Sequence, residues 1–243
     1  MKSAQTSRNT LTAFTVAELL VITGVMSVLT VLMLPSLDDA KANVRTAFCL
    51  NNLKQWGVGF QLYAADWSGY LPSEGSLQAI AAKECWYNAV PPYLKMSSYK
   101  DLPGVGSSIQ PFGKLRIWVC PEKNLRNAKT ASGKNSVFYG MNGYLDDNNF
   151  DDLPHHVLQH VRLSTVTDPN ATILLCDVKA SQVYCDPMDT TFQTYPWQQN
   201  GEGLHQNGAN FLFVDGHVTW FPVSAYWDGS NGITNNPSLR WYP

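Results

Sequence analysis

The residues best suited to chemistry lie in a short run near the carboxy-terminal end, LHQNGANFLFVDGHVTWF, which begins at Leu204. His205, Asp215 and His217 carry imidazole and carboxylate groups, which are common zinc ligands. Asp215 and Gly216, however, also form a strong two-residue turn signal between two apolar runs. We therefore expect a structural hairpin over residues 209–221 in preference to a metal centre.

The acidic segment DDNNFDD at residues 146–152 is a second candidate site. Calcium takes six to eight oxygen ligands, and a loop of this kind can supply several. The possible calcium ligands are Asp146, Asp147, Asp151 and Asp152. A solvated polar loop is the simpler interpretation, and calcium is the alternative. The nearby His155, His156 and His160 have no acid at useful spacing.

The rest of the sequence predicts neither an enzyme nor a nucleic-acid-binding protein. It contains no helical HExxH, no nucleophile elbow and no phosphate loop, so no catalytic residue is assigned and no cofactor beyond the possible calcium. With 17 Lys and Arg against 19 Asp and Glu, the net charge of −2 excludes a basic chain held by phosphate contacts. A hydrophobic content of 44% is enough for a core.

The elements that would carry these residues begin with an apolar segment, FTVAELLVITGVMSVLTVLML, over residues 14–34. Its 21 residues span roughly 31 Å as a helix, enough to cross a bilayer. Lys2 and Arg8 precede it, which predicts a single-pass inner-membrane protein with a cytoplasmic amino terminus and a periplasmic remainder. Glu18 is the one charged residue of the segment, and a carboxylate in lipid usually needs a partner.

The stretch AFTVAELLVI, which starts at Ala13, resembles the type IV prepilin signal. The resemblance implies a basic leader over residues 1–13, cleavage by prepilin peptidase between Ala13 and Phe14, and methylation of the new amino group of Phe14. That family normally has Gly where this chain has Ala13. Residues 14–35 would form the transmembrane and filament-core helix. Glu18 would pair with the Phe14 ammonium group of a neighbouring subunit and so guide assembly.

A second helical pattern follows Pro35 over residues 36–66, so we expect one long bent helix from about residue 14 to about residue 65. The amphipathic half would pack on a loop-rich head over residues 67–243. Strands are expected at Arg116–Val119, Val137–Tyr139 and Thr172–Cys176. In the hairpin, Phe213 is expected opposite Val218 and Phe211 opposite Trp220, which gives a half-buried ribbon.

The run NNLKQWGVGFQLYAADWSGYLP, from Asn51 to Pro72, resembles a pilin-like family known mainly from planctomycetes and verrucomicrobia. Cys49 matches that family's cysteine before NLKQ, and His205 with Asp215-Gly216 matches its His-x9-Asp-Gly motif. The resemblance implies an α+β, pilin-like fold in which a long amino-terminal helix packs on a small antiparallel sheet. It also makes Cys49 and Cys120 a plausible disulfide, while Cys176 and Cys185 are a plausible pair by proximity. Five cysteines leave at least one outside any intrachain disulfide.

Two functions are consistent with these patterns. The first is a structural subunit of a type IV pilus-like or type II secretion pseudopilus-like filament, whose partners are copies of itself, the lipid bilayer, prepilin peptidase and the inner-membrane assembly machinery; the filament can reach the cell surface. The alternative is a membrane-anchored extracytoplasmic module that binds a polysaccharide or surface ligand through carboxy-terminal aromatic rings. Those rings are Trp220, Tyr226, Trp227, Trp241 and Tyr242.

Overall fold

The computed structural model describes residues 14–75, 81–102, 116–118, 139–145, 161–178, 184–185, 205–226 and 236–241. The chain divides into two compact units, residues 1–41 and residues 42–243. Within these ranges the long helix α1 (Val16–Asp66) is followed by short helices. These are α2 (Trp86–Ala89) and the 3-10 turns η2 (Pro91–Leu94), η3 (Tyr99–Asp101), η5 (Arg116–Trp118), η6 (Gly143–Leu145), η7 (Leu163–Thr165) and η8 (Val223–Ala225).

The long helix predicted from the sequence is confirmed as α1, which runs from Val16 to Asp66 and continues through Pro35. Pro35 therefore does not end the helix. The part of α1 in the second unit packs on the head, as expected, through Leu53, Trp56 and Phe60, all of which are fully buried.

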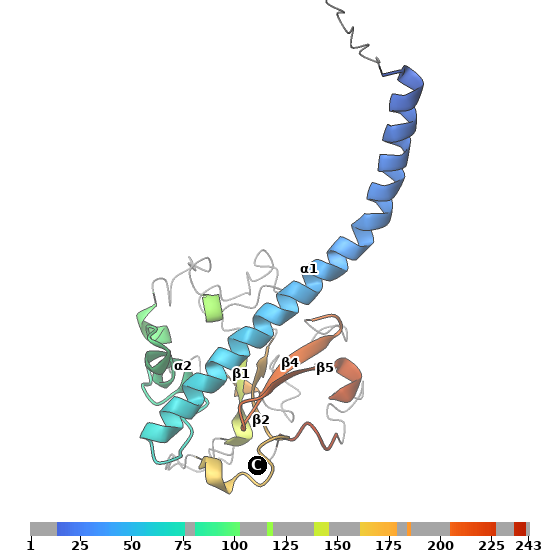
Figure 1. Ribbon diagram of the computed structural model, residues 1–243. Coiled ribbons are helices and arrows are strands. Elements are labelled where there is room, and N and C mark those ends of the chain that lie inside the picture. Colours follow the sequence, from blue (N-terminus) through green and yellow to red (C-terminus); the bar gives the residue numbers. More distant parts are fainter. Residues whose placement is uncertain are drawn as a thin grey trace, which may run out of the picture. The chain divides into compact units, whose positions relative to one another are not determined.

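The second unit contains a five-stranded sheet in the order β3-β1-β2-β4-β5. The strands are β1 (Tyr139–Asn142), β2 (Ile173–Asp177), β3 (Tyr184–Cys185), β4 (Gly208–Phe213) and β5 (Val218–Pro222). Neighbouring strands are antiparallel except β1 and β3, which are parallel. Figure 1 shows the part of α1 that belongs to the second unit lying next to β1, with the other strands beyond it. The α+β architecture with a small, mainly antiparallel sheet is therefore confirmed.

Residues on both faces of the central strands are buried, so the sheet carries two apolar clusters. On the first face, Leu175 and Leu212 pack with the helix residue Trp56. On the second face, Phe211 and Phe213 pack with residues from the carboxy-terminal end of the chain, including Tyr226 and Trp241. All six residues of β4 are buried. The prediction of a half-buried hairpin is therefore wrong, because β4 is a central strand covered on both sides.

The register of the predicted hairpin is also wrong, by one residue. Leu212 lies opposite Val218 and Phe211 opposite Thr219, whereas the sequence suggested Phe213 opposite Val218. The backbone N–H of Phe213 donates to the carbonyl of His217 at 3.0 Å, so three residues form the loop and not two. Gly216 closes that loop with a φ of +87°, as three-residue hairpins with a left-handed glycine require.

The remaining strand predictions had mixed outcomes. The segment Arg116–Trp118 is a 3-10 turn, which corrects the strand predicted there. Of the strand predicted over Val137–Tyr139, only Tyr139 lies within the described residues, and it belongs to β1. The strand predicted over Thr172–Cys176 is confirmed within one residue at each end as β2.

Candidate functional site

The amino-terminal part of α1 exposes a continuous apolar surface. Its large apolar side chains are between 44% and 76% exposed, and Phe14, just before the helix, is 70% exposed. Within the described residues, α1 is the helix long and apolar enough to cross a membrane, although a signal sequence has the same properties. Apolar surface of this extent is rarely left in water, because its burial is the main favourable term in association. This segment is therefore suited to a lipid environment or to packing against other subunits.

Glu18 lies at the start of this surface and forms a reciprocal cap with Thr15. The N–H and the hydroxyl of Thr15 both donate to Oε2 of Glu18, at 2.9 Å and 2.8 Å. The N–H of Glu18 donates in return to the Thr15 hydroxyl at 3.2 Å. This is the arrangement of a capping box, in which a Thr and a Glu three residues later satisfy donors at a helix start. Glu18 therefore has a local structural role, and its role in assembly stays a prediction.

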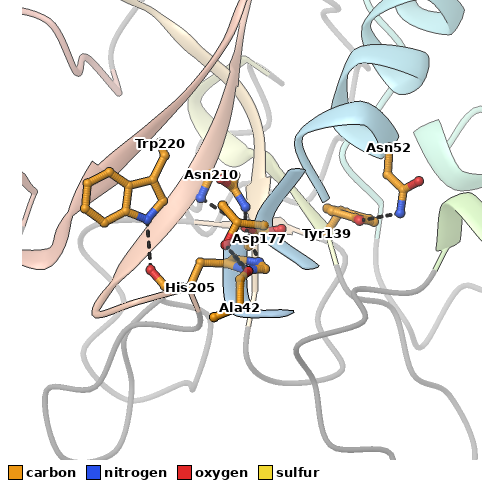
Figure 2. Close-up of polar contacts among 8 residues, drawn as sticks. Ala42, Asn52, Tyr139, Asp177, His205, Asn210 and Trp220 are labelled. Carbon is orange, nitrogen blue, oxygen red and sulfur yellow. Dashed lines mark hydrogen bonds and ion pairs between the residues drawn. The ribbon is translucent and has the colours of Figure 1, made fainter. Parts of the chain in front are cut away.

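His205 is fully buried and lies in a polar cluster with groups from α1, β2 and β4. Its Nε2 lies 3.2 Å from Oδ2 of Asp177, the last residue of β2. The backbone N–H and the side-chain Nδ2 of Asn210 donate to the same carboxylate oxygen at 3.0 Å and 2.7 Å. Figure 2 shows Asp177 between His205 and Asn210. The motif histidine therefore pairs with an aspartate outside the motif.

The loop before β4 brings His205 into this position. Gln206 and Asn207 both have left-handed backbone angles, with φ of +48° and +59°. The tight reversal lets the N–H of His205 donate to the carbonyl of Gly208 at 3.0 Å. The indole Nε1 of Trp220 donates to the carbonyl of His205 at 2.8 Å (Figure 2). A ring from β5 thus holds the loop against the sheet.

The zinc set considered from the sequence, His205 with Asp215 and His217, is not assembled. His205 precedes β4 and Asp215 follows it, and the six residues of β4 span roughly 20 Å. Asp215 instead contacts His217, whose Nδ1 lies 2.6 Å from Oδ1, and both side chains are partly exposed. This pair caps the hairpin loop, as the structural interpretation of the motif predicted.

An aromatic hollow lies at the carboxy-terminal end of α1. It has a volume of about 760 Å³, and its walls include Tyr63, Trp67, Tyr70 and Tyr93. The rings of Tyr63 and Trp67 stack with centroids 5.5 Å apart, and the Trp67 indole N–H donates to the Tyr93 hydroxyl at 3.2 Å. No pattern recognised in the sequence pointed to this hollow.

The carboxy-terminal rings do not form the exposed face that the sequence suggested. Tyr226 and Trp241 are buried in the second apolar cluster. Trp220 is half-buried and its indole N–H is used within the fold. Trp227 and Tyr242 lie outside the described residues. A binding face built from Tyr226 and Trp241 is therefore wrong.

Several predicted site residues fall outside the described part of the chain. These are Ala13, the calcium candidates Asp146, Asp147, Asp151 and Asp152, and His155, His156, His160 and Cys120. The side chain of Cys185 is outside it too. Cys49 and Cys176 are buried and carry thiol groups in the structure. Neither predicted disulfide is seen among the described residues, and both stay predictions.

Comparison with protein-family models, with curated proteins and with solved structures found no match to this chain.

Proposed function

We propose that the chain is a structural subunit of a type IV pilus-like or type II secretion pseudopilus-like filament. One observation carries the proposal: the start of α1 is an exposed apolar helix with a single carboxylate in its first turn, at Glu18. The prepilin-like residues around Phe14 add the expected processing step. In the filament, the apolar surface leaves the bilayer and packs against the same surface of neighbouring subunits.

The geometry of Glu18 is consistent with a second contact between subunits. Both hydrogen bonds from Thr15 reach the same oxygen, Oε2. The carboxylate thus keeps acceptor capacity on Oε1 for the ammonium group of a neighbouring Phe14. A pairing of this kind neutralises two charges in an apolar environment and favours one stagger between helices.

The proposal is tested first by the intact mass and amino-terminal sequence of the protein isolated from its native membrane. A chain that starts at Phe14 and carries one additional methyl group is expected. A chain that still starts at Met1 would contradict processing through the prepilin pathway.

Three variants separate the charge of Glu18 from its role as a cap. Glu18→Gln keeps an acceptor for Thr15 and removes the charge; Thr15→Ala removes most of the cap and keeps the charge; Glu18→Ala removes both. If the charge guides assembly, both Glu18 variants insert in the membrane but enter filaments poorly, whereas Thr15→Ala assembles. Normal assembly of Glu18→Gln together with failure of Thr15→Ala would show that Glu18 acts only as a cap, which contradicts the proposed pairing.

The aromatic hollow supports the alternative, a membrane-anchored module that binds a polysaccharide. Trp67 and Tyr70 are exposed by 57% and 41%, and Lys83 and Glu84 add polar groups at the same hollow. Aromatic faces beside polar groups suit the apolar and hydroxyl-bearing surfaces of a sugar ring. The full chain in detergent should then be retained on immobilised polysaccharides, and Trp67→Ala should abolish retention. No retention on any polysaccharide would exclude this function.

A further inference from the structure

We propose that Cys49, Asp177 and His205 form a buried metal site for a zinc-class divalent cation. The Sγ of Cys49, a carboxylate oxygen of Asp177 and a ring nitrogen of His205 all lie within 4.8 Å of one another. The three side chains come from α1, β2 and the loop before β4, and all three residues are completely buried. This set shares only His205 with the site considered from the sequence.

The orientation of His205 indicates that a positive charge belongs between it and Asp177. The hydroxyl of Thr46 donates its only proton to the carbonyl of Ala42 at 3.1 Å, as expected for a threonine in a helix. The Thr46 oxygen is therefore the acceptor for Nδ1 of His205, 3.4 Å away. With a proton on Nδ1, the neutral ring directs the lone pair of Nε2 at the carboxylate of Asp177, 3.2 Å away. Either a proton or a metal ion must occupy that position.

The carboxylate of Asp177 adds a second, independent indication. His205 is the only ion-pair partner that the described residues give this buried group. Asn210 saturates Oδ2, while Oδ1 of Asp177 and Oδ1 of Asn210 are buried without a hydrogen-bond partner among the described residues. Buried polar oxygens are nearly always satisfied, and a bound ion is one way to satisfy them.

The donor types select the class of metal. A thiolate, an imidazole and a carboxylate together suit zinc, whereas calcium and magnesium prefer oxygen ligands alone. Thr46 would take the role of the outer partner that fixes the ring of a metal-bound histidine. A water molecule or Oδ1 of Asn210 can complete four ligands. Tetrahedral zinc places its ligand atoms about 3.3–3.6 Å apart. Nε2 of His205 and Oδ2 of Asp177 are already 3.2 Å apart, and Sγ of Cys49, which lies within 4.8 Å of both partners, would have to approach them by at most about 1 Å.

The charges of the loaded site balance. Binding of Zn²⁺ would displace the thiol proton of Cys49 and any proton held between Nε2 of His205 and Asp177. The metal, thiolate, carboxylate and neutral imidazole sum to zero, so the buried site would carry no net charge when the ion is bound. Because no ligand residue reaches solvent, the ion would be taken up as the head folds.

The test is the metal content of the full chain, made with a tag free of histidine in zinc-supplemented cells and purified in detergent without chelators. We expect one zinc per chain by mass spectrometry of the elements, near-complete loss in Cys49→Ser and Asp177→Asn, and full retention in the control His217→Asn. Zinc-free protein from these cells overturns the proposal, and so does zinc that persists in both ligand variants.

A second measurement covers the case in which the ligand variants fail to fold. The unmodified chain produced with Co²⁺ in place of Zn²⁺ should show a thiolate-to-cobalt charge-transfer band, because Cys49 is then a ligand. Absence of that band, or a native mass that shows Cys49 in a disulfide with Cys120, overturns the proposal.

Discussion

Replacement of Gly208 by alanine should destabilise the head because the strand beside it cannot give way easily. A Cβ at this position would lie 2.4 Å from the carbonyl oxygen of Phe221 and 2.5 Å from the ring of Trp220. The first is a backbone atom of β5. The second is a ring fixed by its hydrogen bond to the carbonyl of His205. The new methyl group therefore has to displace β5 from β4.

The size of the effect follows from the displacement. Ordinary contacts to a Cβ begin at 3.4 Å, so β5 must move by about 1 Å. That movement strains two hydrogen bonds, from Trp220 to His205 at 2.8 Å and from Val223 to Asn207 at 2.9 Å. Overpacking costs about 1–3 kcal/mol, and each hydrogen bond contributes about 1 kcal/mol. Alanine also restricts the unfolded chain more than glycine does, which stabilises the folded state by roughly 0.4–1 kcal/mol. We expect a net loss of about 2–4 kcal/mol in the free energy of unfolding.

The assay is thermal unfolding of the full chain in detergent, followed by near-ultraviolet circular dichroism of the buried aromatic rings. For a chain of this length the loss corresponds to a fall in Tm of roughly 5–15 °C. Gly24→Ala is the matched control, since a Cβ at Gly24 meets nothing within 4 Å, and its Tm should not fall. A Gly208→Ala protein that melts within about 1 °C of the parent chain would refute the packing argument.

Three further predictions test the core of the head. Gly59→Ala places a Cβ 2.6 Å from Cγ1 of Val90, so overpacking should exceed the gain in helix propensity and lower the unfolding free energy by about 1 kcal/mol, measurable by urea titration. Trp56→Phe removes the indole N–H that donates to the carbonyl of Ile117 at 3.0 Å in a fully buried site, and we expect a loss of about 2–3 kcal/mol in the same titration. Burial raises the pKa of Tyr63 from 10.0 to about 12, so the unfolded chain ionises first and stability should fall as the pH rises from 10.0 towards about 12. Tyr63→Phe should lose less stability than the parent chain over that interval, and an equal loss in both proteins would contradict this assignment.

The long helix could be read from the sequence because its signals are local. The apolar run at the start of α1 and the recurrent apolar positions beyond Pro35 predict one long helix. Gly57 and Gly59 are poor helix formers within this pattern. The structure shows why they are there, since a Cβ would lie 2.8 Å from Leu212 at Gly57 and 2.6 Å from Val90 at Gly59. They let the helix approach the sheet and η2 closely.

The hairpin register could not be read in the same way. The Asp215-Gly216 pair fits a two-residue and a three-residue loop equally well. Contacts distant in sequence decide between them: the N–H of Val214 donates to Thr172 and its carbonyl accepts from Gln61. These contacts hold Val214 in the loop and shift the pairing by one residue. A one-residue shift moves every side chain of a strand to the other face, so the predicted pairs failed together.

The contacts of Glu18 could be predicted from the sequence, whereas those of His205 could not. Thr15 and Glu18 have the spacing of a capping box, and that signal is local because both residues lie within one helical turn. The partner of His205 was not readable, because Asp177 lies in another strand and no spacing rule connects them. The sequence contains only a weak signal for Asp177. Its carboxylate ends the otherwise apolar run ILLCD, and a carboxylate in a buried strand needs a polar or charged partner.

The polar contacts of the head also explain why α1 packs in a single register. Apolar side chains such as Trp56 and Phe60 would tolerate small slips along the sheet. The polar contacts would not: Thr46 lies beside His205, and the side-chain amide of Asn52 donates to the Tyr139 hydroxyl at 3.1 Å (Figure 2). A slip by one helical turn, about 5.4 Å, would break both contacts, at about 1 kcal/mol each. A zinc ion between Cys49 and Asp177 would strengthen the same restraint, because it joins the helix to the sheet at the level of Thr46.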